Sequence, residues 1–189
     1  MTLVALLRHG DTAWSAEGRI QGRSDVPLSD AGRAALAGFR LPACCREMRV
    51  VSSPLSRCTE TAALIGAAGA GREARLVEMS WGQWEGCVLA QLRAELGEAM
   101  RNNEARGWDF RPAGGESPRE VLARARDWLM EVDESTLAVT HRGVIRAIYA
   151  AATAWDLRGA PPAKLDWHAV HLFRLGGGGT PVVEALNLR

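Results

Sequence analysis

The feature that most constrains the fold is a short apolar run, residues 3–7, that ends abruptly in Arg8, His9 and Gly10. A continuous apolar run of this length is typical of a strand buried on both faces, as in parallel sheets. In open α/β sheets, ligands lie beyond the carboxyl ends of the strands. Arg8 and His9 are therefore expected at the edge of a site. The alternative is an ordinary strand end with a surface arginine and a solvated histidine.

A second run of the same kind occurs late in the chain. Residues 136–140 are largely apolar and are followed by His141, Arg142 and Gly143. Two buried strands that each deliver a histidine and an arginine at the carboxyl edge would place both pairs on one rim. Such a pairing is harder to explain by packing than by a cationic site.

The rest of the chain alternates between predicted strands and helices. Further strands are predicted at residues 48–52, 74–77, 168–174 and 181–186, and helices follow Ser29, Ser53, Ser117 and Gly143, with a helical excursion at about 87–116. Strand and helix alternation predicts a layered α/β domain with a mainly parallel sheet. No internal repeat or low-complexity linker divides the chain, so residues 1–189 are predicted to form a single domain.

Two further side chains are predicted at the same rim. Ser53 and Pro54 are typical of a helix cap followed by proline at the first helical position, which puts Arg57 in the first turn after a strand. Glu78 follows the predicted strand at residues 74–77 and begins a segment, residues 78–86, that contains two tryptophans. His168 and His171 are instead expected to be structural residues of a strand.

Composition excludes several classes of function. The formal net charge is +1, whereas nonspecific nucleic-acid binding needs a clear basic surplus. The four cysteines have no metal-ligand spacing with histidine, so no metal site is predicted. No apolar run approaches the roughly 20 residues needed to span a membrane. We therefore expect a cytoplasmic protein with reduced cysteines.

The rim residues suit phosphoryl chemistry without a cofactor. Arginine forks bind carboxylate or phosphate, and the sequence has neither a phosphate-binding nucleotide loop nor an acidic cluster for Mg²⁺. Histidine is a competent nucleophile near neutral pH, because much of its imidazole is uncharged there. Glu78 is the best placed acid to protonate a leaving oxygen.

These motifs together resemble the histidine phosphatase superfamily, which includes the cofactor-dependent phosphoglycerate mutases. The matching segments are residues 8–14, 18–22, 25–29, 52–62, 78–86, 114–117 and 140–141. The resemblance implies a three-layer α/β/α sandwich around a six-stranded mixed, mainly parallel sheet. It also implies that His9 attacks phosphorus, that Glu78 protonates the leaving group, and that the phosphoryl oxygens are held by Arg8, Arg57 and His141.

Two residues depart from the family pattern. Ser15 stands where the family often has asparagine, and Arg142 where it commonly has glycine. Both are candidates for substrate binding, together with Gln21 and Gly22. Strand alternation would send the Arg142 stem away from the phosphate into solvent or an ion pair, although its long side chain can curl back to the rim.

The resemblance favours a phosphatase for a small phosphorylated metabolite, with α-ribazole 5'-phosphate as one candidate. The mutases of the family are generally longer, and this chain has few residues to spare between Gly86 and Gly115. Mutase-type phosphoryl transfer and a non-catalytic phospho-ligand or protein-binding module are the alternatives. Glu85 is the alternative to Glu78 as proton donor. Whether the chain acts as a homodimer stays open.

Overall fold

The two apolar runs form neighbouring central strands of one sheet in the computed structural model, which describes residues 2–189. Strand β1 pairs in parallel with β4, β4 with β2 and β2 with β3, whereas β5 and β6 are antiparallel. Across the sheet the order is β3 (Gly71–Arg72), β2 (Arg49–Ser52), β4 (Thr136–Thr140), β1 (Leu3–Arg8), β5 (Val170–Leu175) and β6 (Pro181–Leu188). The predicted six-stranded mixed sheet is confirmed.

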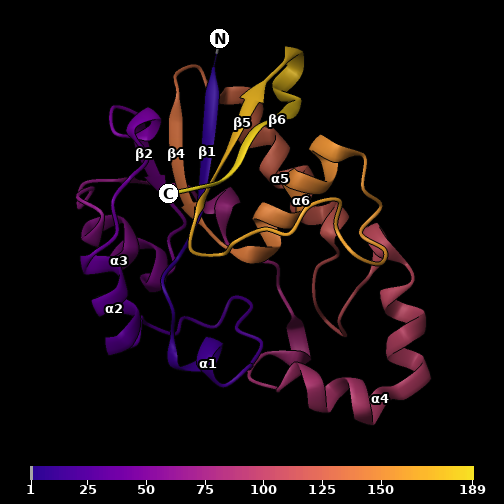
Figure 1. The fold of residues 1–189 in the computed structure, drawn as a ribbon. Helices are drawn as coiled ribbons and strands as arrows, with labels where there is room; N and C mark the ends of the chain where they lie inside the picture. The colour runs from indigo at the N-terminus through magenta and orange to yellow at the C-terminus, as the bar shows by residue number, and fades with distance from the viewer. Residues whose placement is uncertain (1) are drawn as a thin grey trace.

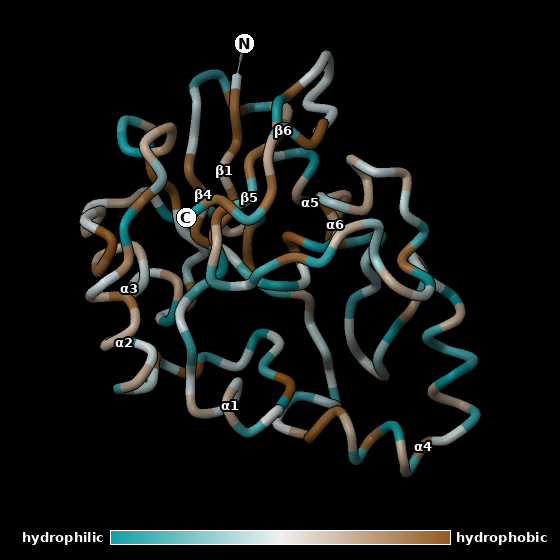
Figure 2. The backbone as a smooth tube through the Cα atoms, in the orientation of Figure 1, coloured by the Kyte–Doolittle hydropathy of each residue, from teal (hydrophilic) through white to brown (hydrophobic). Residues whose placement is uncertain are grey.

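Alternate side chains of β1 pack into two separate hydrophobic cores. Val4 and Leu6 pack into the core shared with helices α5 (Pro118–Glu131) and α6 (Arg142–Thr153), and Ala5 and Leu7 into the core on the opposite face. All four are almost fully buried, and full burial of a leucine side chain contributes about 1.5–3 kcal/mol. In Figure 2, brown marks the hydrophobic residues along β1.

Helices cover both faces of the sheet, as the three-layer prediction requires. Figure 1 shows α2 and α3 together on one side and α5 and α6 on the other. The bounds are α2 (Asp30–Ala37), α3 (Ser56–Leu64), α5 (Pro118–Glu131) and α6 (Arg142–Thr153). Two predicted caps are confirmed: the Ser29 side chain caps α2, and Ser117 with Glu120 forms a capping box on α5.

The start of α3 differs from the prediction. Ser53 is not its N-cap, because the Ser53 backbone N–H continues the strand ladder to the Val139 carbonyl and its hydroxyl lies against His141. Leu55 occupies the N-cap position instead, and the helix begins at Ser56. Arg57 is nevertheless in the first turn, as predicted.

The strand predicted at residues 74–77 is wrong. Residues Ala74–Leu76 form a 3-10 turn, because the Glu73 side chain accepts hydrogen bonds from the backbone N–H and the guanidinium of Arg75. The edge strand β3 is only Gly71–Arg72. Glu78 therefore follows a tight turn instead of a strand end.

The strand predicted at residues 168–174 begins late. His171 is a fully buried residue of β5, but His168 lies in the turn before the strand and is exposed. Its Nε2 atom is 3.1 Å from Asp11 Oδ2, in the loop that follows β1. The prediction that His168 is a strand residue is therefore wrong.

A helical arm projects from the body within the predicted excursion. Helix α4 (Leu89–Glu104) changes direction at Gly97, whose φ of 51° is readily adopted only by glycine. The arm is attached by a small apolar cluster around Ile20, Leu92 and Met100. A further short helix, α1 (Ala13–Ala16), lies between β1 and α2. Among residues 2–189, no helix has the length and apolar character needed to cross a membrane.

Candidate active site

His9 is placed by the strand end and fixed by its neighbour. Its backbone N–H donates to the Thr140 carbonyl of β4, and its Nδ1 atom is 2.7 Å from the Gly10 carbonyl oxygen. Because a carbonyl can only accept, Nδ1 carries the proton and Nε2 keeps a free lone pair. A Cβ on residue 10 would come within 2.6 Å of the Leu36 side chain, so glycine permits this close approach.

His141 meets His9 from the adjacent strand end. The centres of the two rings are 5.2 Å apart. His141 is fully buried, with Nε2 2.8 Å from Ser53 Oγ and 3.4 Å from Cys58 Sγ. The parallel pairing of β1 and β4 thus brings together the two histidines that the sequence predicted on one rim.

Both histidines are held in the uncharged form. Burial lowers the pKa of His9 well below its ordinary value, and the positive charges of Arg8 and Arg57 lower it further. Burial likewise depresses the pKa of His141, assisted by the charges of His9 and Arg57. An uncharged imidazole with a free Nε2 is the form that a nucleophile requires.

Arg57 is fully buried and reaches the loop that follows β1. Its two terminal nitrogens donate to the carbonyl oxygens of Ser24 and Gly22, at 2.8 and 2.7 Å. Within the described residues, its Nε–H has no acceptor, and the buried Gln21 side-chain oxygen has no donor. An unpaired buried donor is costly unless a ligand satisfies it, so Arg57 is equipped to bind an anion.

Arg8 is oriented by an acidic side chain. Its guanidinium lies 3.2 Å from Asp11 Oδ1, and the other Asp11 oxygen faces His168. Ser15 also donates to Asp11 and forms the capping box of α1 with Thr12. The Ser15 hydroxyl therefore has a local structural role, and its role in substrate binding stays a prediction.

Glu78 is buried against the start of α6. One of its oxygens accepts hydrogen bonds from the backbone N–H groups of Met79, at 2.8 Å, and Gly143, at 3.0 Å. Burial raises the pKa of the Glu78 carboxyl, and these hydrogen bonds limit the rise. A raised pKa suits a carboxyl group that donates a proton near neutral pH.

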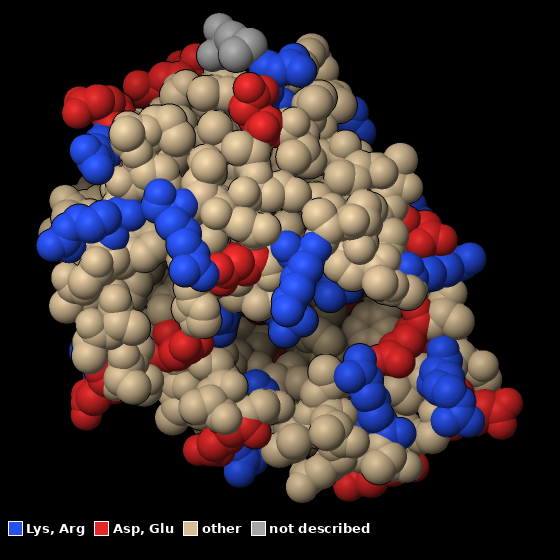
Figure 3. Space-filling model, viewed as in Figure 1, with Lys and Arg blue, Asp and Glu red and all other residues tan. Residues whose placement is uncertain are grey.

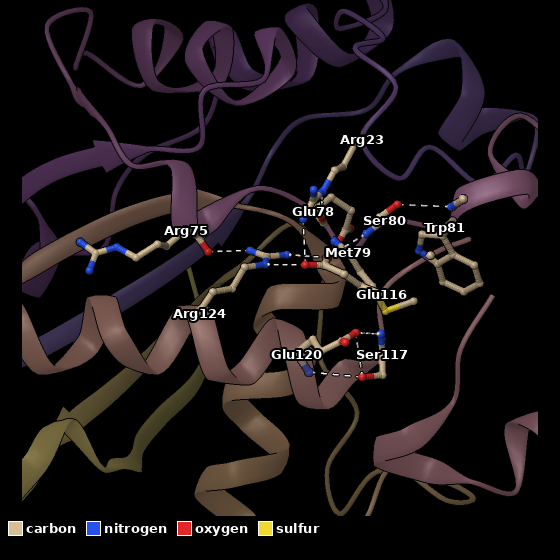
Figure 4. Close-up of polar contacts among 12 residues, drawn as sticks. Arg23, Arg75, Glu78, Met79, Ser80, Trp81, Glu116, Ser117, Glu120 and Arg124 are labelled. Atoms are coloured by element: carbon tan, nitrogen blue, oxygen red, sulfur yellow. Dashed lines mark hydrogen bonds and ion pairs between the residues drawn. The ribbon is translucent and has the colours of Figure 1, made fainter. Parts of the chain in front are cut away.

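The turn that carries Glu78 is fastened by residues that the sequence reasoning did not single out. Figure 4 shows Arg124 of α5 between the Arg75 carbonyl and Glu116. Glu116 in turn accepts from the Ser80 backbone N–H and pairs with Arg23. Two sequence signals lay near these residues: the capping box at Ser117, which marks the start of α5, and the matching segment 114–117, which contains Glu116.

The Glu85 carboxylate is engaged by several hydrogen-bond donors. It accepts hydrogen bonds from the backbone N–H groups of Arg23, Ser24 and Trp81 and from the Ser24 hydroxyl. Burial opposes ionisation, but these donors hold the pKa of Glu85 below its ordinary value. A carboxylate so fully engaged stabilises the loop near Arg57 and is poorly suited to donate a proton.

The site as a whole is a cationic cleft with one buried acid. Figure 3 shows the face hollowed between the body and the α4 arm, with Lys and Arg side chains along its border. No cluster of three or more metal-ligating side chains occurs among residues 2–189. The arrangement can bind a phosphoryl group with arginine and histidine donors, offer it a nucleophile, and protonate a leaving oxygen.

The sequence is similar to those of known proteins. The family description "Histidine phosphatase superfamily (branch 1)" matches residues 4–188. The phosphoglycerate mutase-like protein 4 of Arabidopsis thaliana is 36% identical over 93% of this chain and 80% of its own. The metal-independent phosphoserine phosphatase of the same plant is 33% identical over 79% of this chain and 68% of its own.

A solved structure agrees with these matches. The mycobacterial glucosyl-3-phosphoglycerate phosphatase in complex with VO3 superposes with a TM-score of 0.78 at 28% identity, covering 100% of both chains.

Proposed function

The chain belongs to branch 1 of the histidine phosphatase superfamily, and we propose that it hydrolyses a small phosphorylated metabolite through a phosphohistidine at His9. The observation that carries the proposal is the His9–His141 pair, with ring centres 5.2 Å apart. Arg57 and Glu78 are both buried, and the positive charge of Arg57 limits the rise in the pKa of Glu78 that burial causes.

The first step transfers the phosphoryl group to the enzyme. Nε2 of His9 attacks phosphorus in line, forming an N–P bond as the ester P–O bond breaks. Arg8, Arg57 and His141 hold the equatorial oxygens as their charge redistributes. The protonated Glu78 carboxyl gives its proton to the departing alkoxide, which leaves as an alcohol.

The second step regenerates the enzyme. The Glu78 carboxylate takes a proton from a water molecule, whose oxygen attacks phosphorus as the N–P bond breaks. Inorganic phosphate leaves, and the proton remains on Glu78 for the next cycle. No metal or organic cofactor takes part in either step.

Two other activities compete with this one. A mutase would return the phosphoryl group to an alcohol instead of water. A binding module would hold a phosphorylated ligand without turnover, and such modules usually lose the nucleophile or the acid, whereas this chain keeps His9 and Glu78.

A screen of phosphorylated metabolites separates the three activities. We expect inorganic phosphate from several substrates, no conversion of 3-phosphoglycerate into its 2-isomer in the presence of 2,3-bisphosphoglycerate, and no phosphate with His9→Ala. Isomerisation without phosphate release would identify a mutase. Binding without turnover would identify a module. α-Ribazole 5'-phosphate belongs in the screen as a candidate supported only by sequence pattern.

A further inference from the structure

We propose that Arg142 and Arg146 of α6 form a second anion subsite, which binds a carboxylate or a further phosphate of the substrate whose phosphoryl group reaches His9. This inference rests on the proposed function, because it concerns the rest of the same substrate. It makes the enzyme selective for phosphomonoesters that carry a second anionic group.

The two arginine side chains share a helix face, and each packs against a tryptophan ring. They are four residues apart on α6, so their side chains lie on one face of the helix. The Arg142 guanidinium carbon is 4.8 Å from the centre of the Trp167 ring, and that of Arg146 is 5.0 Å from the centre of the Trp155 ring. Each guanidinium therefore lies on an aromatic face, which orients it and leaves its edge N–H groups open.

Neither arginine has an anionic partner among residues 2–189. Arg8, Arg75 and Arg119 each pair with a carboxylate. In the part of the chain that the structure describes, no carboxylate oxygen lies within the 4.0 Å ion-pair distance of Arg142 or Arg146. This distinguishes the two from arginines whose charge serves to hold the fold together.

The charges around them are mainly positive. Burial lowers the pKa of Arg142, and the positive charges of Arg8 and Arg93 lower it further against an opposing effect of Glu78. Arg146 is affected in the same way by burial, Arg142 and Arg93. Because a guanidinium keeps its proton in proteins, the repulsion among these groups persists until an anion enters.

The subsite adjoins the phosphoryl site. Arg142 directly follows His141 in the chain, about 3.8 Å away between Cα atoms. Arg142 is close enough to Arg8 for the Arg8 charge to lower the pKa of Arg142, and the Arg142 charge in turn lowers the pKa of Arg146. A small substrate can therefore place its phosphoryl group at His9 and a second anion on Arg142, with Arg146 further from the reacting centre.

Matched substrates test the subsite. O-Phospho-L-serine differs from O-phosphoethanolamine only by a carboxylate, and propanediol bisphosphate differs from propanediol monophosphate only by a phosphate. The measured quantity is the ratio of kcat/KM within each pair, for the parent, for Arg142→Gln, for Arg146→Gln and for the double variant. Arg126→Gln, an exposed arginine on α5, is the matched control.

We expect the parent to favour one or both anion-bearing substrates by about tenfold or more, the size of a charge-assisted hydrogen bond. The double variant should lose this preference, and Arg126→Gln should keep it. The pair that shows the preference distinguishes carboxylate from phosphate. No preference in the parent, or an unchanged preference in the double variant, would overturn the subsite.

The two proposals fail separately. If the parent released phosphate from p-nitrophenyl phosphate but showed no preference within the pairs, the subsite alone would be wrong. If it released phosphate from nothing, the proposed hydrolysis would be wrong. Calorimetric Kd values for the same pairs on His9→Asn would then still test the subsite, with the same preference expected. If the double variant did not fold, a preference in the parent that failed to weaken at high salt would contradict an exposed ionic subsite.

Discussion

His9 and His141 face each other across the ends of two parallel strands, with their ring planes inclined by 60° and neither ring exposed by more than 4%. Protonation of either ring would bury a positive charge beside the other histidine and beside Arg57. The pair is therefore constrained to the uncharged state that the first chemical step needs.

The constraint makes stability depend on pH in a defined direction. A histidine whose pKa is lowered by folding contributes stability above its unfolded pKa, near 6.5, and this contribution is lost as the pH falls towards the folded pKa. The unfolding free energy should therefore decrease below about pH 6.5. In urea titrations, His9→Asn should reduce the slope by about 1.4 kcal/mol per pH unit. An unchanged slope would mean that His9 is not held uncharged by the fold.

Glu78→Gln tests the assigned acid. Turnover of alkyl phosphates should fall by about 10²–10⁴-fold, and phosphorylation of the enzyme by p-nitrophenyl phosphate should fall far less. The nitrophenolate leaves without a proton, so its departure does not need the carboxyl group. Normal formation of the phosphoenzyme from an alkyl ester in this variant would contradict the assignment and return attention to Glu85.

Gly143→Ala tests the position of that acid without changing its chemistry. A Cβ at residue 143 would lie 2.3 Å from a Glu78 oxygen, so the carboxyl group must move. We expect kcat for alkyl phosphates to fall by about 100-fold, as misplacement of about 1 Å can cause. Gly177→Ala is the control, because no atom lies within 4 Å of its added Cβ. Equal activity in both variants would show that the Gly143 contact does not position Glu78.

The part of the site that could be predicted comes from local sequence. The apolar runs that end before His9 and His141 predict the two strands directly. Parallel pairing of these strands then places both histidines at one edge of the sheet. The unpredicted part depends on contacts between distant segments. The local sequence predicted Ser53 as a helix cap. In the structure its hydroxyl instead lies against His141, which is 88 residues away in the chain.

Arg142 shows the same limit from the other side. Its direction was predicted from strand alternation, but Arg142 is the first residue of α6, and the aromatic ring under its side chain comes from Trp167, in the turn before β5. Glu85 likewise was considered a possible proton donor from its sequence position alone. The hydrogen bonds that it accepts from the Arg23 and Ser24 backbone come from a segment 61 to 62 residues away, which its local sequence does not show. Periodicity and caps are local, whereas a side chain's hydrogen-bond partners are decided by tertiary packing.

Metal removal should leave the activity unchanged. The cleft offers arginine and histidine donors to the phosphoryl oxygens, so prolonged EDTA treatment followed by assay in chelated buffer should retain full phosphate release. Added Mg²⁺ should change the rate by no more than an equal ionic strength of NaCl does. Loss of activity on chelation, restored by a divalent cation, would replace this mechanism with metal-ion catalysis.

The most direct test is to trap the phosphoenzyme. The protein is mixed with a substrate that carries a radiolabelled phosphoryl group, quenched in alkali within the first turnover, digested and mapped. We expect alkali-stable, acid-labile label on the peptide that contains His9, and none with His9→Ala. Phosphate release in the first turnover with no label on His9, or label on another residue, would contradict the proposed mechanism.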